Sequence, residues 1–330
     1  MSQESTSGRE GPALREMEAI LLELGWQVTR IPVEGAERYA LLARMTDDFD
    51  VTLSTHLDTV PPYLPPRLDG DTLWGRGACD AKGIAASMVV AAGQLRDAGV
   101  RAALLFVVGE ETTHDGAHAA NEWIRANLPQ RPRVIINGEP TESTLGVGTK
   151  GAQRVIVRTA GKAAHSAYPA MGRSATRDLV LLLAELEQVE WPSDPLLGET
   201  TVNIGSLAGG VADNVFAPSA EARLMFRLVT PAAEIQERVG QWAHGRASLE
   251  WGVMVPPVRL GVVDGFATSV AAFATDIPAL TNWGTPYLFG PGSIHVAHTD
   301  NEHVHASELT SAVTAYVSIA KAALRRLDGN

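Results

Sequence analysis

The apolar run from Ala102 to Val108 is the feature that most constrains the fold of this chain. A short continuous run of this kind predicts a strand buried on both faces, as in a largely parallel sheet. Two adjacent carboxylates, Glu110 and Glu111, follow it almost at once. Ligands of an open α/β sheet bind outside the carboxyl ends of its strands. We therefore expect a functional site where this strand ends.

Three further predicted strands lead into residues of the same kind. They cover residues 51–55, 134–136 and 286–289, and they are followed in that order by His56 with Asp58, by Glu139 and by His298. We expect these side chains, distant in sequence, to meet at one rim of the sheet. Histidines and carboxylates without thiolates favour zinc, manganese or cobalt as hydrolytic metals.

A glycine-rich turn, from Trp74 to Gly83, contains one acidic residue, Asp80. The apolar residues that follow, 84–92, predict a packed helix. A carboxylate at the start of a buried helix needs a partner, because an unpaired buried charge is very costly. Two metal ions about 3.5–4 Å apart need a bridging carboxylate. The sequence therefore predicts that Asp80 bridges two metals.

At two of the strand ends, the two polar residues of each pair are expected to have different roles. A metal-bound histidine usually donates its second ring N–H to a carboxylate, so Asp58 is expected to orient His56. At the next strand end, one of Glu110 and Glu111 is expected to bind metal while the other handles protons. Taken alone, each pair is also compatible with an ordinary solvated loop.

The hydrophobic pattern divides the chain into two predicted domains. Residues 1–150 and 256–330 form a discontinuous metal-binding domain, and residues 151–255 form an insertion. Within the insertion, strands at 153–159, 201–207, 220–229 and 248–255 and helices at 175–189 and 232–244 give the β-α-β-β-α-β order of a ferredoxin-like unit. Outside it, we expect a frayed terminus at 2–11, a helix at 268–275 and a closing helix at 306–327.

The composition restricts the partners of this protein. A net charge of −11 argues against nucleic acid and anionic membranes. The single cysteine, Cys79, excludes an internal disulfide framework and fits a reducing compartment. The first ten residues lack the apolar core of a signal peptide, and no segment approaches the roughly 20 apolar residues of a membrane span. These features predict a soluble, cytoplasmic protein.

Six motifs of this sequence together resemble those of the dinuclear zinc metallohydrolases. The family includes acetylornithine deacetylase, succinyl-diaminopimelate desuccinylase, aminoacylase-1 and carboxypeptidase G. The motifs are THLDTV at 55–60, GRGACDAKG at 75–83, GEE at 109–111, GEPT at 138–141, GKAAHS at 161–166 and AHTDNE at 297–302. The resemblance implies an α/β, zinc-peptidase-like catalytic domain with a mixed, largely parallel sheet flanked by helices. It also implies that the ferredoxin-like α+β insertion serves as a lid and in dimerisation.

The resemblance further implies a role for each matching residue. His56, Asp80 and Glu139 would hold one zinc ion, and Asp80, Glu111 and His298 the other. Glu110 would be the general base, Asp58 the orienter of His56, and His165 would polarise the scissile carbonyl, often across a dimer interface. Substrate would be bound by Arg173, Asn214, Arg227, Gly290 and Gly292. The Asp80–Ala81 peptide bond would be cis.

The function expected from these residues is that of a metal-dependent amidohydrolase. It would remove a small acyl group from an N-acyl amino acid, as acetylornithine deacetylase does, with a metal-activated water and Glu110 as general base. A desuccinylase, a dipeptidase or a carboxypeptidase on the same site is the alternative. A non-catalytic binding protein would be favoured by loss of Glu110 or a metal ligand, and none is lost. A thiol hydrolase using Cys79 is a third alternative.

Overall fold

The computed structural model describes residues 1–35 and 37–329, and they form two compact units. The first unit contains residues 1–148, 259–271 and 275–330, of which Ala36 and Asn330 are not described. The second unit contains residues 149–258 and 272–274. Each unit has its own hydrophobic core, and each is described by itself below.

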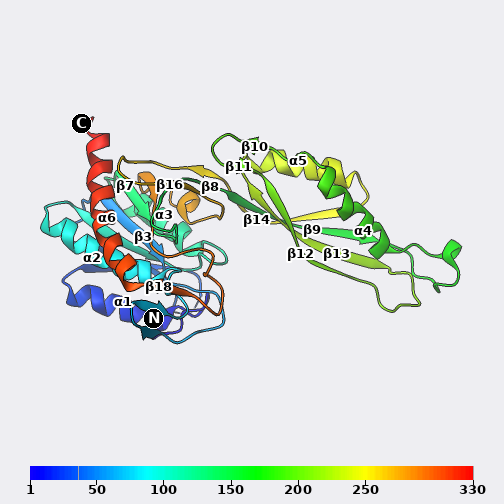
Figure 1. The fold of residues 1–330 in the computed structure, drawn as a ribbon, viewed down its shortest axis with the longest axis horizontal. Coiled ribbons are helices and arrows are strands. Elements are labelled where there is room, and N and C mark those ends of the chain that lie inside the picture. The colour runs from blue at the N-terminus through cyan, green and yellow to red at the C-terminus, as the bar shows by residue number, and fades with distance from the viewer. Residues whose placement is uncertain (36, 330) are drawn as a thin grey trace. The chain divides into compact units, whose positions relative to one another are not determined.

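The first unit is built on a six-stranded sheet with the order β1-β2-β6-β3-β7-β17 (Figure 1). Strands β6, β3, β7 and β17 run parallel, while β1 and β2 add an antiparallel edge. The strands are β1 (Gln27–Pro32), β2 (Tyr39–Arg44), β3 (Val51–His56), β6 (Ala102–Val107), β7 (Val134–Asn137) and β17 (Thr285–Leu288). This is the mixed, largely parallel sheet that the sequence predicts.

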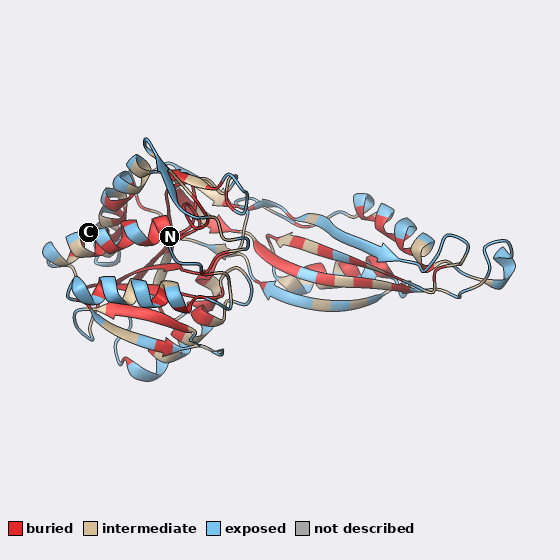
Figure 2. Ribbon diagram, turned by 90° about the horizontal axis from the view of Figure 1, so that it is seen from below, coloured by how far each residue is buried: buried red, intermediate tan, exposed pale blue. Residues whose placement is uncertain are grey.

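Helices cover both faces of this sheet. Helices α1 (Gly11–Glu23), α2 (Lys82–Asp97) and α6 (Ala306–Leu327) pack on one face, and α3 (Asp115–Asn127) packs on the other. Successive residues of β6 point to opposite faces, so that Leu104 joins the α2 side and Leu105 joins the α3 side. All six residues of β3 and of β6 are buried, which Figure 2 shows as continuous red strands.

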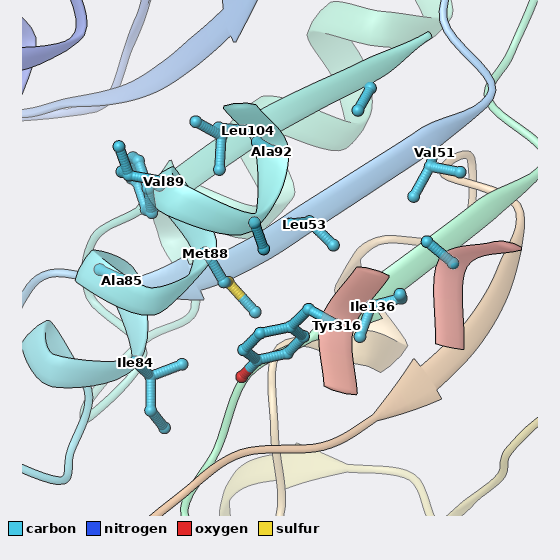
Figure 3. Packing of buried hydrophobic residues seen from close by; sticks show 14 of the residues in the cluster. Val51, Leu53, Ile84, Ala85, Met88, Val89, Ala92, Leu104, Ile136 and Tyr316 are labelled. Carbon is cyan, nitrogen blue, oxygen red and sulfur yellow. The ribbon is translucent and has the colours of Figure 1, made fainter. Parts of the chain in front are cut away.

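The contact between α2 and the sheet is made by small and medium side chains. Met88 of α2 lies between Leu53 of β3 and Tyr316 of α6 in Figure 3. Alanines on α2, among them Ala85 and Ala92, let the helix approach the strands closely. Helix α2 is therefore held firmly at the point where its first turn follows Asp80.

Short strands complete the first unit. Strands β18 (His303–His305), β5 (Thr72–Trp74) and β4 (Arg67–Asp69) form one small sheet. Strands β15 (Val258–Arg259), β8 (Leu145–Thr149) and β16 (Thr268–Ala271) form another, next to a 3₁₀ turn, η3 (Ile277–Ala279). The first of these sheets joins the segment before Asp80 to the segment after His298.

The second unit is an antiparallel sheet with the order β12-β13-β9-β14. Its elements are β9 (Gly151–Ala160), η1 (Pro169–Met171), α4 (Ala175–Ala184), η2 (Glu185–Gln188), β10 (Ser193–Asp194), β11 (Gly198–Glu199), β12 (Thr201–Gly209), β13 (Ser219–Leu228), α5 (Ala232–Ala243) and β14 (Ser248–Val255). Buried and less buried residues alternate along β13, because α4 and α5 cover only one face of the sheet. This is a ferredoxin-like unit.

Two local predictions were wrong. Residues 268–275 do not form a helix, because Thr268–Ala271 pairs with β8 as strand β16. The segment 2–11 is not frayed, since Ser5 and Glu10 are fully buried and Thr6 pairs with Thr59. In both cases tertiary pairing decides the conformation, and a local sequence pattern carries little information about it.

Two glycines of α2 give a matched test of the close packing near Asp80. A Cβ atom at Gly83 would overlap the carbonyl oxygen of Ala78, whereas a Cβ atom at Gly93 meets no atom within 4 Å. We expect Gly83→Ala to lower the free energy of unfolding by about 1–3 kcal/mol through overpacking. Gly93→Ala should raise it by about 0.5–1 kcal/mol, because alanine favours a helix. Urea unfolding of the metal-free protein measures both, and equal effects would contradict this account.

Candidate metal centre

The strand ends of the first unit bring the predicted ligands together. His56 is the last residue of β3, Glu110 and Glu111 follow β6, and Glu139 follows β7. The parallel neighbours β6, β3 and β7 end at the same edge, so these residues share one rim of the sheet. His298 reaches the same rim from the loop after β17.

The carboxylate of Asp80 lies between two imidazoles. Its Oδ1 is 2.9 Å from Nε2 of His56, and its Oδ2 is 3.1 Å from Nε2 of His298. Each oxygen thus faces a different histidine, and both histidines point Nε2 toward the same carboxylate. This is the arrangement expected of a carboxylate that bridges two metal ions.

One further carboxylate lies beside each histidine. Nε2 of His298 is 3.0 Å from Oε1 of Glu111, and Nε2 of His56 is 3.9 Å from Oε2 of Glu139. Ligand atoms of His56, Asp80 and Glu111 all lie within 4.8 Å of one another, which suits a metal ion. The second carboxylate oxygen of Glu139, Oε1, is buried and accepts no hydrogen bond from the described residues. An unpaired buried carboxylate oxygen is costly, and a cation would satisfy it.

The pKa shifts show how unfavourable this group of charges is without a cation. Burial raises the pKa of Glu110 well above its ordinary value, and the nearby carboxylate of Glu139 raises it further. Burial likewise raises the pKa of Glu139, to which Asp80 adds. Hydrogen bonds to Asp80 and Glu111 raise the pKa of His298 to about 10. Without a metal ion, bound protons therefore reduce the repulsion between these carboxylates. A bound metal ion would take over that role.

The donor set fits two divalent ions. His56 with Glu139 would hold one ion, His298 with Glu111 the other, and Asp80 would contribute one oxygen to each. All of these donors are imidazole nitrogens or carboxylate oxygens, which suit zinc and similar metals. Such ions would satisfy the buried oxygen Oε1 of Glu139. Their positive charge would also lower the raised pKa values of Glu110 and Glu139.

Asp58 does more than orient His56. Nδ1 of His56 is 2.9 Å from the backbone oxygen of Asp58 and 3.6 Å from its Oδ1, so the backbone carbonyl is its nearer partner. The carboxylate of Asp58 accepts the backbone N–H groups of Glu110, at 3.1 Å, and Glu111, at 3.2 Å. Burial alone would raise the pKa of Asp58, but hydrogen bonds from His56, Ser7 and Glu111 lower it. Asp58 therefore fixes the backbone of the loop that carries the predicted base.

The turn that presents Asp80 depends on a buried ion pair that the sequence analysis missed. Arg76 donates to Glu302 at 2.5 Å, and both side chains are almost completely buried. Glu302 also accepts the backbone N–H groups of Gly77, at 2.8 Å, and Asp80, at 3.3 Å. The Asp80–Ala81 peptide bond is cis, as the resemblance implies. Glu302 belongs to the AHTDNE motif, which is the only sequence signal that pointed to it.

The glycines at 290 and 292 lie directly behind the ligands. A Cβ atom at Gly290 would overlap the backbone oxygen of Glu139, and one at Gly292 would crowd the side chain of Cys79. The loop therefore packs on the backbone of the metal site. Burial raises the pKa of the Cys79 thiol, and the charges of Glu302 and Asp80 add to this effect. A buried thiol with a raised pKa is a poor nucleophile, which argues against the thiol hydrolase.

His114 is a second residue whose surroundings the sequence did not indicate. Its Nδ1 lies 2.9 Å from Oδ1 of the buried Asp276. Asp276 raises the pKa of Glu110 as well. Asp276 comes from the segment predicted to follow a helix, and no motif marked it.

The remaining predicted residues belong to the second unit, where they lie at opposite ends of the sheet. Arg227 pairs with Ala152 at the start of β9. At the other end of β9, Ala160 pairs with Ser219, and the predicted residues His165, Arg173 and Asn214 lie in the loops that follow. There, His165 bridges Val215, Arg173 bridges Lys162 and donates to the carbonyl of Ala160, and the carbonyl of Asn214 accepts the N–H of Ser166.

Comparison with known proteins decides the family. The model of peptidase family M20/M25/M40 matches residues 52–322, which include every residue of the rim. The chain belongs to this family. A peptidase M20 domain-containing protein of Schizosaccharomyces pombe is 37% identical over 311 residues, which cover 91% of this chain and 76% of that protein. A probable carboxypeptidase of Aspergillus flavus is also 37% identical, over 89% of this chain and 77% of that protein.

Several solved structures, two of them described as M20 family peptidases, share the fold of the M20 chain described here. An aminopeptidase of Bacillus cereus is 21% identical and superposes with a TM-score of 0.77, covering 98% of this chain and 95% of that chain. A metallo-carboxypeptidase of Sulfolobus solfataricus is 15% identical with a TM-score of 0.76, covering 98% and 97%. A Bacillus subtilis protein described as a dinuclear metal-binding peptidase is 16% identical with a TM-score of 0.70, covering 97% and 94%.

The family membership confirms that this M20 protein is a hydrolase of amide bonds. A candidate metal site lies at the rim of its sheet. Within the described part of the chain, no helix combines the length and the apolar character that crossing a membrane requires.

The pKa of His298 predicts that metal binding to this M20 protein releases protons. Its imidazole, with a pKa of about 10, is protonated at pH 7 in the metal-free protein, and a metal ion needs the same Nε2. Metal affinity should therefore rise with pH between about 6 and 8, by about tenfold per pH unit for each proton released. Calorimetric titration with zinc in buffers of different ionisation enthalpy measures the protons.

Two histidine variants complete this measurement. His298→Ala should release fewer protons and bind metal more weakly, whereas His295→Ala, in the same loop, should match the wild type. An affinity that does not change with pH, or equal behaviour of the two variants, would contradict the assignment of His298.

Proposed function

We propose that this protein is a dinuclear metal-dependent hydrolase that cleaves the amide bond before an amino acid with a free carboxylate. The observation that carries this proposal is the position of Asp80, with one carboxylate oxygen near His56 and the other near His298. A bridging carboxylate between two histidines is suited to a pair of metal ions that polarise a carbonyl and activate water.

We assign the metal ligands as the resemblance implies. His56, Asp80 and Glu139 hold one ion, and Asp80, Glu111 and His298 hold the other. Zinc is the proposed native metal because nitrogen and oxygen donors suit it, and cobalt or manganese would suit the same donors. Bound there, the ions supply Lewis-acid polarisation and lower the pKa of a bound water to about 7.

Glu110 carries the proton in the proposed reaction. Its carboxylate accepts a proton from the attacking water and later gives that proton to the leaving amine. Asp58 keeps this carboxylate in position through the backbone N–H groups of Glu110 and Glu111.

Arg227 is the proposed partner of the substrate carboxylate. Burial and the nearby Arg154 lower its pKa, so its charge lacks compensation. Among residues 1–35 and 37–329, no carboxylate pairs with it. A bound carboxylate would supply the missing charge, and arginine binds carboxylates with two parallel hydrogen bonds. Gly290 and Gly292 remain proposed members of the substrate loop.

Two candidate reactions differ only in the group on the acyl side of the cleaved amide bond. The probable carboxypeptidases among the relatives favour a peptide, so that the group removed is a C-terminal amino acid. Removal of a small acyl group from an N-acyl amino acid, as by acetylornithine deacetylase, uses the same bond, the same base and the same free carboxylate. Both belong to the same proposed chemistry, and a substrate panel separates them.

The proposal predicts hydrolysis of one class within a panel of N-acetyl amino acids, N-succinyl amino acids and dipeptides, assayed with added zinc or cobalt. Glu110→Gln removes the base but not a metal ligand. We expect it to retain two metal ions per chain and to lose about 10²–10⁴-fold in kcat, the usual contribution of a general base. Metal content is measured by atomic emission, and turnover by release of free amine.

Glu122→Gln, on the solvent side of α3, is the matched control and should leave kcat unchanged. Turnover that survives in Glu110→Gln would show that the base is misassigned. Full activity of a metal-free preparation would exclude the mechanism.

We further propose that two copies assemble through the second unit. Strand β12 is an edge strand of nine residues without charge or proline, and its Ile204 and Leu207 are about half exposed. Such an edge pairs readily with another strand. The same edge of a second copy would match it in an antiparallel, two-fold arrangement.

The separation of the substrate residues supports this assembly. Arg227 and Ser219 lie eight residues apart on β13, or about 26 Å at a rise of ~3.3 Å per residue. His165 lies beyond the Ser219 end, so His165 and Arg227 of one copy cannot both touch a substrate of dipeptide size. We propose that His165 acts on the substrate bound by the other copy, as the resemblance implies.

Mixing two inactive variants tests this arrangement. Glu110→Gln and His165→Ala should each be impaired, and each should remain a dimer by light scattering. After subunit exchange in a 1:1 mixture, half of the dimers carry one intact site, so about a quarter of the wild-type activity should return. A mixture no more active than its components would place His165 and Glu110 in the same copy or remove His165 from the reaction.

A further inference from the structure

The segment Ser5–Glu10, which the sequence suggests is frayed, is paired with the loop that contains Asp58. Thr6 forms a parallel bridge with Thr59, and the N–H of Thr59 donates to the carbonyl of Ser5 at 3.0 Å. The N–H of Ser7 donates to the carbonyl of Thr59 at 3.2 Å. The hydroxyl of Ser5 donates to the carbonyl of Leu57 at 2.7 Å, and Ser5 is fully buried. The segment thus extends the structure beyond the end of β3.

This pairing directs the hydroxyl of Ser7 at the carboxylate of Asp58. Oγ of Ser7 donates to Oδ2 of Asp58 at 2.7 Å, the shortest hydrogen bond that this carboxylate accepts among the described residues. The backbone N–H groups of Glu110 and Glu111 donate to the same carboxylate, at 3.1 and 3.2 Å. Hydrogen bonds to a buried carboxylate are strong, and losing one leaves a charged oxygen less satisfied.

The same segment is also held at the far end of the loop that contains Glu110. The buried carboxylate of Glu10 accepts from Nε of Arg38 at 3.1 Å. Another nitrogen of Arg38 donates to Asp115 at 3.0 Å, and Asp115 is the first residue of α3. The Glu110–Glu111 loop therefore lies between two contacts of one segment, at Asp58 before it and at Asp115 after it.

We propose that Ser7 is a positioning residue of the metal centre. It fixes the carboxylate of Asp58, and Asp58 in turn fixes His56 and the backbone of Glu110 and Glu111. This inference rests on the proposed function for the roles of those residues. Without the hydroxyl, the carboxylate gains freedom to turn, and the loop it holds loosens. Outer partners of this kind tune metal affinity, and small displacements of a base are costly to turnover.

Three variants separate the hydroxyl from the segment that carries it. Ser7→Ala removes the hydroxyl, Ser7→Thr keeps it, and Thr6→Ala changes the neighbouring side chain, whose hydroxyl faces Glu4. Zinc affinity is measured by competition with a chromophoric chelator on the full-length, metal-stripped protein. We expect Ser7→Ala to bind zinc about 10–100-fold more weakly than the wild type. Ser7→Thr and Thr6→Ala should bind within about threefold of the wild type, well below the loss expected for Ser7→Ala.

Turnover provides the second measurement. Ser7→Ala should lower kcat with little change in KM, because substrate contacts are unaffected. Wild-type zinc affinity in Ser7→Ala would overturn the proposal, and so would an equal loss in Ser7→Ala and Thr6→Ala, which would assign the effect to the segment. If the wild type binds zinc but cleaves no substrate of the panel, the proposed function is wrong. The comparison of zinc affinities still tests whether Ser7 positions the metal centre.

Discussion

The mutual repulsion of carboxylates at one rim of the sheet is the constraint on which the rest of the structure depends. Asp80, Glu111 and Glu139 lie beside the imidazoles of His56 and His298. Burial and the charges of Glu139 and Glu111 raise the pKa of the nearby Glu110. Charges gathered in this way are unfavourable in a poorly solvated site. They are held there by elements too well packed to move apart, and a pair of cations is what would make the arrangement favourable.

Rigid support is visible behind each ligand. Strands β3 and β6, buried along their whole length, fix the directions in which His56 and the Glu110–Glu111 loop leave the sheet. The turn before α2 is fixed by Glu302, whose carboxylate accepts two backbone N–H groups and pairs with Arg76. A metal centre needs such support, because ligands must stay close to their productive geometry.

The two units have different tasks in the proposed enzyme. The first unit supplies every candidate ligand, the proton carrier and the proposed glycine loop, and the second supplies the side chains proposed for substrate binding. In the second unit, helices α4 and α5 leave one face of the sheet uncovered, and the edge strand β12 carries no charge. Fold alone would not assign these tasks, since the assignment depends on particular side chains.

Much of the scaffold could be predicted from the sequence, because its signals are local. The apolar run at 102–108 became β6, Ala306–Leu327 was predicted to its ends, and the acids at strand ends indicated a rim. A short continuous apolar run indicates a strand buried on both faces, and apolar residues at helical spacing indicate an amphipathic helix. The grouping of His56, Glu111 and Glu139 followed from the rule that parallel strands end at one edge.

Only the tertiary structure decided the contacts between distant segments. The pairing of Thr6 with Thr59, the strand at Thr268–Ala271 and the ion pair between Arg76 and Glu302 depend on partners that no local pattern identifies. A serine in a polar terminus looks the same whether it is solvated or donates to a buried carboxylate. The sequence by itself determined which residues are candidates for metal binding and proton transfer. The folded chain determined what holds them, because a hydrogen bond between segments is specified by position in space.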